Sequence, residues 1–288
     1  MKTMKKFSVF VLAVLVVIAA FGFMRHERRQ SSEIMRLREE IQFLTVRTDM
    51  LVSKSGEISD AETFRDNCIK YANGGGQNYL AIGNSITLHE IDGYWWSLCG
   101  MAASEPSKDY FHLVTEELRK HNSLVNSYAY SSCVWETLAH DRAESIIQID
   151  PYLNEHINII TIQLGENVTD LTTFESDYEY LIRHIKQKCP NAQIITVSDF
   201  WENGERDNMK FRASERCNVR IADIRAIKNN QDYMCGIDSY VTGDDGEKHI
   251  VKHAGVANHP GDKGMRYIAD RIIECIDYTN MKGDLNHE

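Results

Sequence analysis

Residues 79–86 read Tyr79-Leu80-Ala81-Ile82-Gly83-Asn84-Ser85-Ile86, an apolar run that ends abruptly in Gly-Asn-Ser. This pattern is typical of a buried strand that delivers a serine to the rim of a sheet. Far downstream, His259 stands directly before a segment with a helical pattern. A serine needs a base to become a nucleophile at neutral pH, and histidine is the usual base. The two segments together indicate a hydrolase or an acyl-transfer enzyme.

Strands and amphipathic helices alternate along the rest of the chain. The expected strands are 79–83, 124–130, 157–164 and 193–199, and the expected helices are 108–121, 173–189, 207–228 and 262–278. Continuous apolar strands separated by amphipathic helices are typical of a parallel sheet that is covered on both faces. The sequence therefore predicts a three-layer α/β/α sandwich with a mainly parallel, flavodoxin-like sheet. In such a fold the site lies at the carboxyl ends of the strands.

The first 24 residues are expected to lie outside this fold. Lysines at positions 2, 5 and 6 precede the uncharged run 9–24. With Phe7 and Ser8 this run reaches about 18 residues, the lower limit for a helix that spans a bilayer. Residues 20–22 would also suit signal cleavage. We favour an uncleaved single-pass signal anchor with the catalytic domain outside the cytoplasm, although the charges that flank the run nearly balance.

Residues 25–57 are highly charged and are expected to form a helical stalk or linker. Apolar residues and one threonine recur there at spacings of three and four: Ile34, Leu37, Ile41, Leu44, Thr48 and Leu51. This seam fits a solvated single helix, and it fits equally a short parallel coiled coil that forms a homodimer. The expected domains are therefore a membrane segment at 1–24, the stalk at 25–57 and a catalytic domain at 58–288.

The composition excludes some classes of partner. The formal net charge of -10 argues against a nucleic-acid partner, which would need a basic face. The seven cysteines are scattered and form no C-x-x-C pair, so they do not suggest a zinc site. Several adjoin apolar residues and are expected to be buried thiols. No metal or organic cofactor is implied.

Four short blocks resemble the SGNH (GDSL-like) hydrolases over residues 78–276. The nucleophile block is Gly83-Asn84-Ser85, where the family commonly has Gly-Asp-Ser. Gly100 is the candidate for the glycine of the second block. Gly165-Glu166-Asn167 matches the third block, Gly-x-Asn, and His259-Pro260 matches the last. Each block alone is an ordinary turn or helix end, but their order and their place after strands make the set specific.

The resemblance implies a role for each block. Ser85 would attack an ester carbonyl, and His259 would take its proton and return it to the leaving alcohol. The oxyanion would be held by the backbone N–H groups of Ser85 and Gly100 and by the side-chain amide of Asn167. The other histidines have no matching context, and His89 is expected on a helix after Ser85.

Two positions depart from the family pattern. The family usually carries an aspartate three residues before the histidine, and here that position is Val256. Another acid could reach back to the histidine, and the candidates are Asp238, Asp244 and Asp245. Otherwise the site is a Ser–His dyad whose imidazole ring is held by a backbone carbonyl or by Asn258. The second departure is Asn84, which we read as structural and not as a sign of inactivity.

These observations predict a membrane-anchored SGNH-type serine esterase that uses no cofactor. We expect carboxyl esters as substrates, above all acetyl esters on cell-surface glycans, which follows from the expected location and from the resemblance. Tyr94, Trp95 and Trp96 are candidates to stack on a sugar ring, unless they are buried. Two alternatives stay open: an O-acyltransferase that uses the same site, and a catalytically weak surface-binding or scaffold protein.

Overall fold

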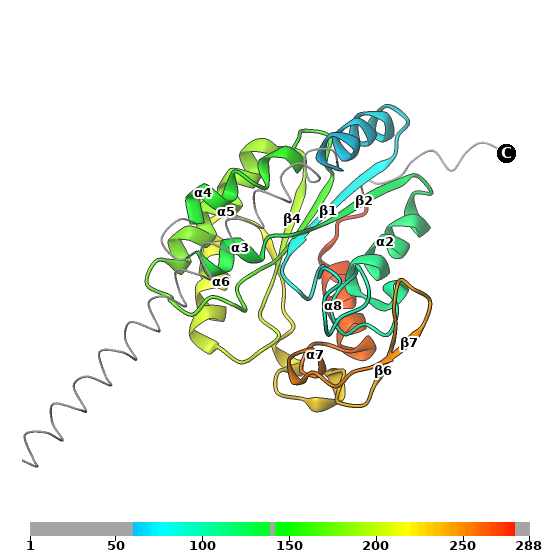
Figure 1. Ribbon diagram of the computed structural model, residues 1–288. Coiled ribbons are helices and arrows are strands. Elements are labelled where there is room, and N and C mark those ends of the chain that lie inside the picture. Colours follow the sequence, from blue (N-terminus) through cyan, green and yellow to red (C-terminus); the bar gives the residue numbers. More distant parts are fainter. Residues whose placement is uncertain (1–59, 139–141, 280–288) are drawn as a thin grey trace, which may run out of the picture. The chain divides into compact units, whose positions relative to one another are not determined.

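The computed structural model describes residues 60–138 and 142–279, which are built around a five-stranded parallel sheet (Figure 1). The strand order is β2-β1-β3-β4-β5, which is the flavodoxin-like order. All residues of β1 and β3 are buried, as expected for strands covered on both faces. The predicted parallel α/β architecture is confirmed. The strands are β1 (Gln77–Gly83), β2 (Val125–Ser131), β3 (Ile159–Gln163), β4 (Gln193–Val197) and β5 (Arg220–Ala222).

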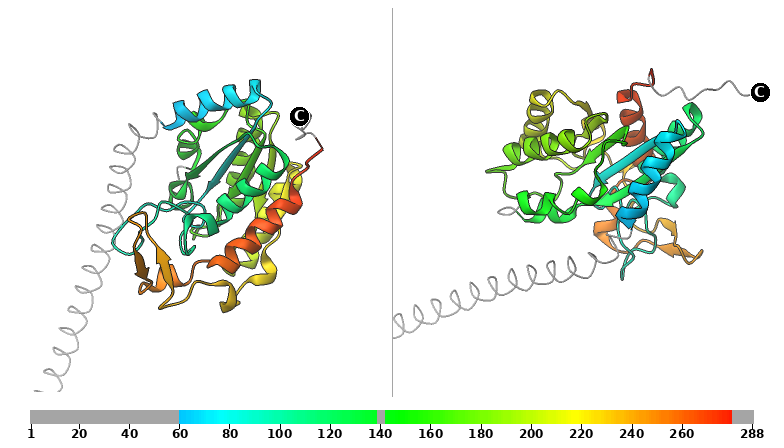
Figure 2. Two further views of the ribbon diagram at one scale, coloured as in Figure 1. Left: turned by 90° about the vertical axis from the view of Figure 1, so that its right-hand side faces the viewer. Right: turned by 90° about the horizontal axis from the view of Figure 1, so that it is seen from above.

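One face of the sheet is covered by α2 (Tyr110–His121) and α8 (Asp262–Cys275), which pack against each other (Figure 2). Tyr79 and Ala81 of β1 belong to this core, together with Ile268 of α8. Side chains alternate between the two faces of a strand, so the neighbouring residues of β1 point the other way.

Leu80 and Ile82 accordingly lie in the core on the opposite face. This face is covered by the helical residues 60–73 and by α3, α4, α5 and α6. Tyr178 and Leu181 of α5 are fully buried here, on the apolar stripe that predicted this helix. The bounds are α3 (Cys133–Thr137), α4 (Arg142–Ile146), α5 (Phe174–Lys188) and α6 (Gly204–Arg216).

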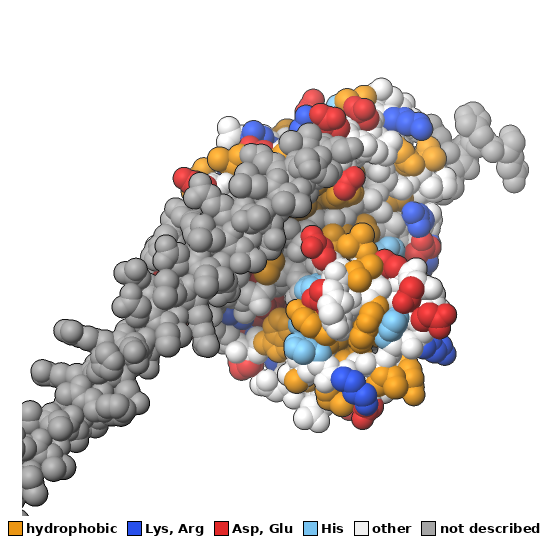
Figure 3. All heavy atoms as spheres, in the orientation of Figure 1, with side chains coloured by type: hydrophobic (Ala, Val, Ile, Leu, Met, Phe, Trp, Pro, Cys, Tyr) orange, Lys and Arg blue, Asp and Glu red, His pale blue; other side chains and the backbone are white. Residues whose placement is uncertain are grey.

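A small lobe lies beyond the carboxyl end of β1 in space, at the bottom of Figure 1. It contains the antiparallel pair β6 (Tyr240–Thr242) and β7 (Lys248–Ile250), followed by α7 (Ala254–Ala257). Trp95 packs in one cluster with Val241 and Val256, so the loop after β1 and this lobe share a core. Figure 3 shows hydrophobic and histidine side chains gathered on the surface of the lobe.

Two expectations about these elements are wrong, and two short strands of the lobe were not expected. The helix expected at 207–228 ends at Arg216, because Asn218 adopts φ 50° and turns the chain into β5. His89 lies on no helix and forms an isolated antiparallel bridge with Cys99. The short strands β6 and β7 were not expected, because three residues each are too few for a periodic signal.

The expected membrane segment at 1–24 and stalk at 25–57 lie outside the described residues. Within residues 60–138 and 142–279, no helix combines the length and the apolar character that crossing a bilayer requires. The anchor, the coiled coil and the domain boundaries therefore stay predictions.

All seven cysteines are free thiols, and the structure buries four of them as expected: Cys68, Cys99, Cys189 and Cys217. Burial raises the pKa of the Cys99 thiol to about 12, so it is protonated at neutral pH. In the described part of the chain no group of three His, Cys, Asp or Glu side chains is arranged to hold a metal ion.

Candidate active site

Ser85 lies in the tight turn that follows β1. Gly83 ends the strand, and a Cβ there would lie 1.8 Å from Thr87 Oγ1 and 2.8 Å from Gln163 O, so only glycine fits. The side chain of Asn84 shapes the turn, because its Oδ1 accepts the N–H of Ile86 at 3.0 Å. The Ser85 hydroxyl is thereby presented at the carboxyl edge of the sheet.

The structure brings Ser85 and His259 together, although 174 positions separate them. Ser85 Oγ lies 2.8 Å from His259 Nε2, and His259 Nδ1 lies 2.7 Å from the carbonyl oxygen of Gly255. A carbonyl oxygen only accepts, so Nδ1 carries the proton of the neutral ring. Nε2 is then free to accept the Ser85 proton. The arrangement is a Ser–His dyad with a backbone carbonyl in the place of the acid.

The three aspartates that were candidates for a third catalytic residue are engaged elsewhere. Asp244 accepts from Ser97 Oγ at 2.6 Å and from the N–H of Leu98 at 3.0 Å. Asp245 pairs with His249 at 2.9 Å. Asp238 pairs with Lys252. None of them contacts His259, so of the two alternatives left open by the sequence the geometry favours the dyad.

Replacement of Asp238 or Asp245 by asparagine should change kcat/KM for p-nitrophenyl acetate by less than about twofold, because exposed substitutions away from the site are nearly neutral. Removal of a true triad aspartate costs on the order of 10⁴-fold in kcat. Steady-state assays of the two variants beside wild type test whether either aspartate completes a triad. A loss of that size in either variant would restore the triad.

Burial lowers the pKa of His259 from its usual 6.5 to about 4. The hydrogen bond to Gly255 acts in the opposite direction, while His89 and His253 add to the lowering. The indole of Trp201 packs edge-on against the imidazole, with ring centroids 4.9 Å apart. At neutral pH the ring is therefore uncharged and able to take a proton.

The acid limb of kcat/KM should have its midpoint near pH 4 and not near 6.5. A general base works only while neutral, and a lowered pKa keeps His259 neutral down to about pH 4. The sign for stability follows too: this group stabilises the fold above pH 6.5 and destabilises it as the pH falls toward 4. A pH–rate profile with a stable amide or ester substrate measures the midpoint. A midpoint at pH 6 or above would contradict the burial argument.

Gly100 does not direct its N–H toward Ser85. That group donates to Asp109 Oδ2 at 3.0 Å, in the turn before α2. A Cβ at Gly100 would lie 2.5 Å from the carbonyl oxygen of Ile86, so glycine is needed for close packing. The N–H expected to bind the oxyanion is engaged in the structure, and packing accounts for the glycine.

Two of the expected oxyanion donors remain available. The backbone N–H of Ser85 makes no hydrogen bond with the described residues. Asn167 follows β3, and its Nδ2 donates one hydrogen to Glu136 Oε2 at 2.6 Å. The second hydrogen of this amide has no acceptor among residues 60–138 and 142–279. One backbone donor and one amide donor can therefore face a developing negative charge.

Glu136 in α3 is a site residue that the sequence analysis missed. Its side chain is buried and accepts from Asn84 Nδ2 at 3.0 Å, from the N–H of Gly165 at 2.5 Å and from Asn167. Burial raises the pKa of this carboxyl, and the three donors act against that rise. Its position in the sequence could have indicated this role, because Glu136 follows β2, the neighbour of β1, and therefore lies at the carboxyl edge of the sheet.

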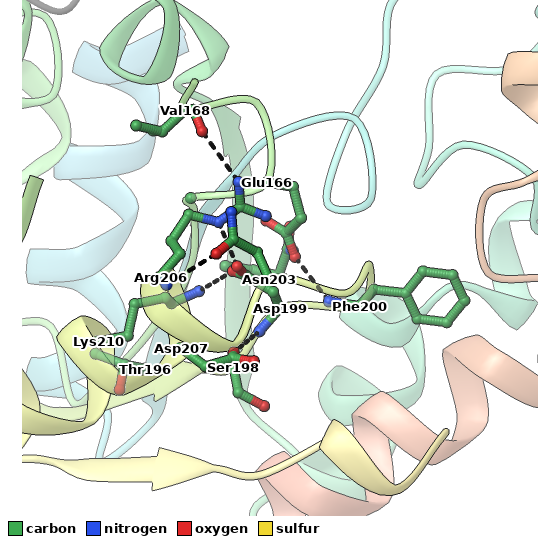
Figure 4. Close-up of polar contacts among 12 residues, drawn as sticks. Glu166, Val168, Thr196, Ser198, Asp199, Phe200, Asn203, Arg206, Asp207 and Lys210 are labelled. Carbon is green, nitrogen blue, oxygen red and sulfur yellow. Dashed lines mark hydrogen bonds and ion pairs between the residues drawn. The ribbon is translucent and has the colours of Figure 1, made fainter. Parts of the chain in front are cut away.

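Glu166 connects the site to a buried charge network, which Figure 4 shows. It accepts from Asn84 Nδ2 at 2.9 Å, from Gln163 Nε2 at 2.6 Å and from the N–H of Phe200 at 3.2 Å. Burial raises the pKa of Glu166 to about 7, and the nearby Asp199 adds to the rise. Behind it, Asp199 pairs with Lys210 at 2.9 Å and also with Arg206.

No protein-family model and no curated protein matches the chain. Solved structures do. An extracellular lipase from Streptomyces rimosus matches with 12% identity and a TM-score of 0.43, covering 70% of this chain and 100% of the lipase. A protein of Bacteroides ovatus described as a GDSL-like lipase matches with 17% identity and a TM-score of 0.43, covering 69% and 97%. An acetyl xylan esterase from Geobacillus stearothermophilus matches with 17% identity and a TM-score of 0.44, covering 70% and 95%. Among solved structures, as in its sequence blocks, the chain is thus similar to GDSL-like hydrolases.

Proposed function

We propose that this protein is a serine ester hydrolase of the SGNH type, with Ser85 as nucleophile and His259 as general base. The observation that carries the proposal is the 2.8 Å contact between Ser85 Oγ and His259 Nε2, with Nδ1 held by Gly255. A serine paired with a neutral, oriented imidazole at a strand end is the arrangement that acyl transfer requires. Two donors for the oxyanion lie on the adjoining loops.

The reaction would proceed in two steps. Ser85 Oγ attacks the ester carbonyl as its proton passes to His259 Nε2, and the alcohol leaves with that proton. Water then attacks the acyl-enzyme while His259 takes one of its protons, and His259 returns that proton to Ser85 Oγ as the bond to the acyl group breaks and the acid is released. The tetrahedral oxyanion binds the N–H of Ser85 and the amide of Asn167 in each step. Gly100 is left out of this scheme, because its N–H is bonded to Asp109.

Reaction with a fluorophosphonate probe tests the nucleophile directly. The wild-type protein should form one covalent adduct at Ser85, found by peptide mass spectrometry, and should hydrolyse p-nitrophenyl acetate. Absence of both labelling and turnover would contradict the hydrolase proposal and favour the alternative of a binding or scaffold protein. Labelling without turnover would favour a transferase, in which an acceptor alcohol takes the place of water.

The substrate class in this proposal is an acetylated glycan. Tyr94 is 39% exposed, and its ring stacks on His253 with centroids 4.3 Å apart, beside the loop that holds His259. An exposed aromatic ring can stack on a sugar. Trp95 is fully buried and has no such role. Tyr94→Ala should raise KM for acetate release from acetylated xylan and leave p-nitrophenyl acetate turnover unchanged; equal effects on both substrates would argue against a sugar contact.

The location in this proposal is a membrane, with residues 1–24 as a single-pass anchor and the catalytic domain outside the cytoplasm. The support is the uncharged run 9–24 behind three lysines. After expression of the full chain, the protein should sediment with membranes and resist carbonate extraction. A protease added to intact cells or spheroplasts should cleave the domain. Recovery in the soluble fraction at the mass of residues 23–288 would indicate a cleaved signal peptide instead.

A further inference from the structure

Two carboxylates, those of the buried Glu136 and the partly buried Glu166, converge on the amide of Asn84. Its Nδ2 lies 3.0 Å from Glu136 Oε1 and 2.9 Å from Glu166 Oε2, so both hydrogens have an acceptor. Its Oδ1 accepts the N–H of Ile86. The whole side chain has no exposed surface. The Asn84 side chain therefore donates two hydrogen bonds through its nitrogen and accepts one through its oxygen, a combination that an amide provides and a carboxylate does not.

An aspartate at position 84 would reverse this arrangement. An ionised carboxylate has no hydrogen to donate, and three carboxylates would meet at hydrogen-bond distance with no donor between them. The sequence block that contains Asn84 commonly has aspartate in the family it resembles. The contacts with Glu136 and Glu166 give a physical reason why this chain has asparagine there.

The same two acids reach the rest of the site. Glu136 also accepts from the N–H of Gly165 and from Asn167 Nδ2, the amide that is proposed to bind the oxyanion. Glu166 also accepts from Gln163 at the end of β3. Because the turn that carries Ser85 and the loop that carries Asn167 share these acceptors, their relative position depends on them.

We propose that Asn84, Glu136 and Glu166 form one positioning unit, which orients the Asn167 amide relative to Ser85 and which requires a hydrogen-bond donor at position 84. The inference rests on the proposed function. None of the three residues acts on the substrate; they act through Ser85 and Asn167. Loss of the contacts that orient the ligands of a metal site typically costs about 10- to 100-fold in activity, and we expect a loss of the same order here.

The charges around the unit set its response to pH. The groups that influence Glu166 are two acids, Asp199 and Glu136, and two bases, Lys210 and Arg206. The phenols of Tyr110 and Tyr178 also lie near it. Burial and the neighbouring acids raise the pKa of Glu166 to about 7, so a further acid at position 84 would retain a shared proton into the neutral range.

The test is Asn84→Asp in the full-length protein. At pH 8 we expect kcat to fall about 10- to 100-fold with KM nearly unchanged, because the loss lies in the orientation of the oxyanion donor. The loss should shrink as the pH is lowered from 8 to 5.5, since a protonated carboxyl can again donate. A loss that is the same at every pH, or wild-type activity at pH 8, would overturn the proposal.

The double variant Asn84→Asp/Glu166→Gln is the matched rescue. It contains as many carboxylates as the wild type, and the new amide at 166 can donate to the new carboxylate at 84. It should recover at least part of kcat at pH 8 and flatten the pH dependence. A double variant no better than Asn84→Asp would contradict the unit. Asp207→Asn removes a buried carboxylate that contacts neither Asn84 nor Asn167, so it controls for a general loss of buried charge.

Thermal unfolding separates failure of this inference from failure of the proposed function. If the wild type neither labels with a fluorophosphonate nor turns over ester, the proposed function fails. Melting temperatures still test the unit itself. The melting temperature of Asn84→Asp should lie further below that of the wild type at pH 8 than at pH 5.5, and the added Glu166→Gln substitution should reduce this deficit at pH 8. Equal melting temperatures for all variants at both pH values would rule the unit out as well.

Discussion

Ser85→Ala should lower kcat for p-nitrophenyl acetate by about 10⁴- to 10⁶-fold, because loss of a serine nucleophile removes the covalent path and leaves only binding and oxyanion stabilisation. Among residues 60–138 and 142–279, Ser85 Oγ is the only side-chain atom that forms a hydrogen bond with His259 Nε2. The measurement is a steady-state rate, corrected for spontaneous hydrolysis. His259→Ala should cost a comparable factor.

The double variant Ser85→Ala/His259→Ala should be no slower than either single variant, since residues that act as a unit give non-additive losses. Ser127→Ala is the matched control, because it removes the same atom from β2, where Ser127 lies opposite Tyr79 of the nucleophile strand. It should stay within about twofold of wild type. If Ser85→Ala retained a tenth of the activity, a different group would be the nucleophile and the proposal would fall.

The fold was predictable from sequence where residues repeat a simple physical pattern. β1 and β3 are covered on both faces, so their apolar runs are continuous and their bounds agree with expectation within about two residues. The helix at α5 shows a clear apolar stripe. β5 was missed because only three residues pair there and the helical pattern of α6 runs on past Arg216. A single residue with positive φ, Asn218, ends that helix, and no periodicity reports it.

The site was predictable only in part, for a related reason. Ser85, Asn167 and His259 follow strands or precede a helix, so their places at one edge of the sheet follow from topology. What holds them is different: the His259 ring is held by the carbonyl of Gly255, and a backbone carbonyl has no signature in a sequence. Glu136 likewise has no recognisable signal in the sequence, because its role depends on three hydrogen-bond donors that come from two other loops.

Asp199→Asn should destabilise the protein by about 3–5 kcal/mol, because it leaves buried positive charges without their partner. The Asp199 carboxylate has no exposed surface, and it pairs with Lys210, also fully buried, at 2.9 Å, and with Arg206. The pKa of Lys210 is held well above its usual value, with Asp199 as the largest favourable influence against the effect of burial. The asparagine keeps the size of the side chain but removes the charge. Urea unfolding, followed by tryptophan fluorescence, measures the difference in the free energy of unfolding.

Two further variants make the outcome interpretable. Asp223→Asn breaks an ion pair with Arg225 in which both side chains are 44% exposed, and such a pair is worth about 0–1 kcal/mol. Asp199→Asn/Lys210→Met removes the carboxylate together with one of the two cations that it pairs with, and it should regain part of the loss, because only Arg206 then lacks its charged partner. If Asp199→Asn cost no more than Asp223→Asn, the buried network would have to be hydrated in solution. Its coupling to Glu166, and through Glu166 to the serine turn, would then be weaker than the structure indicates.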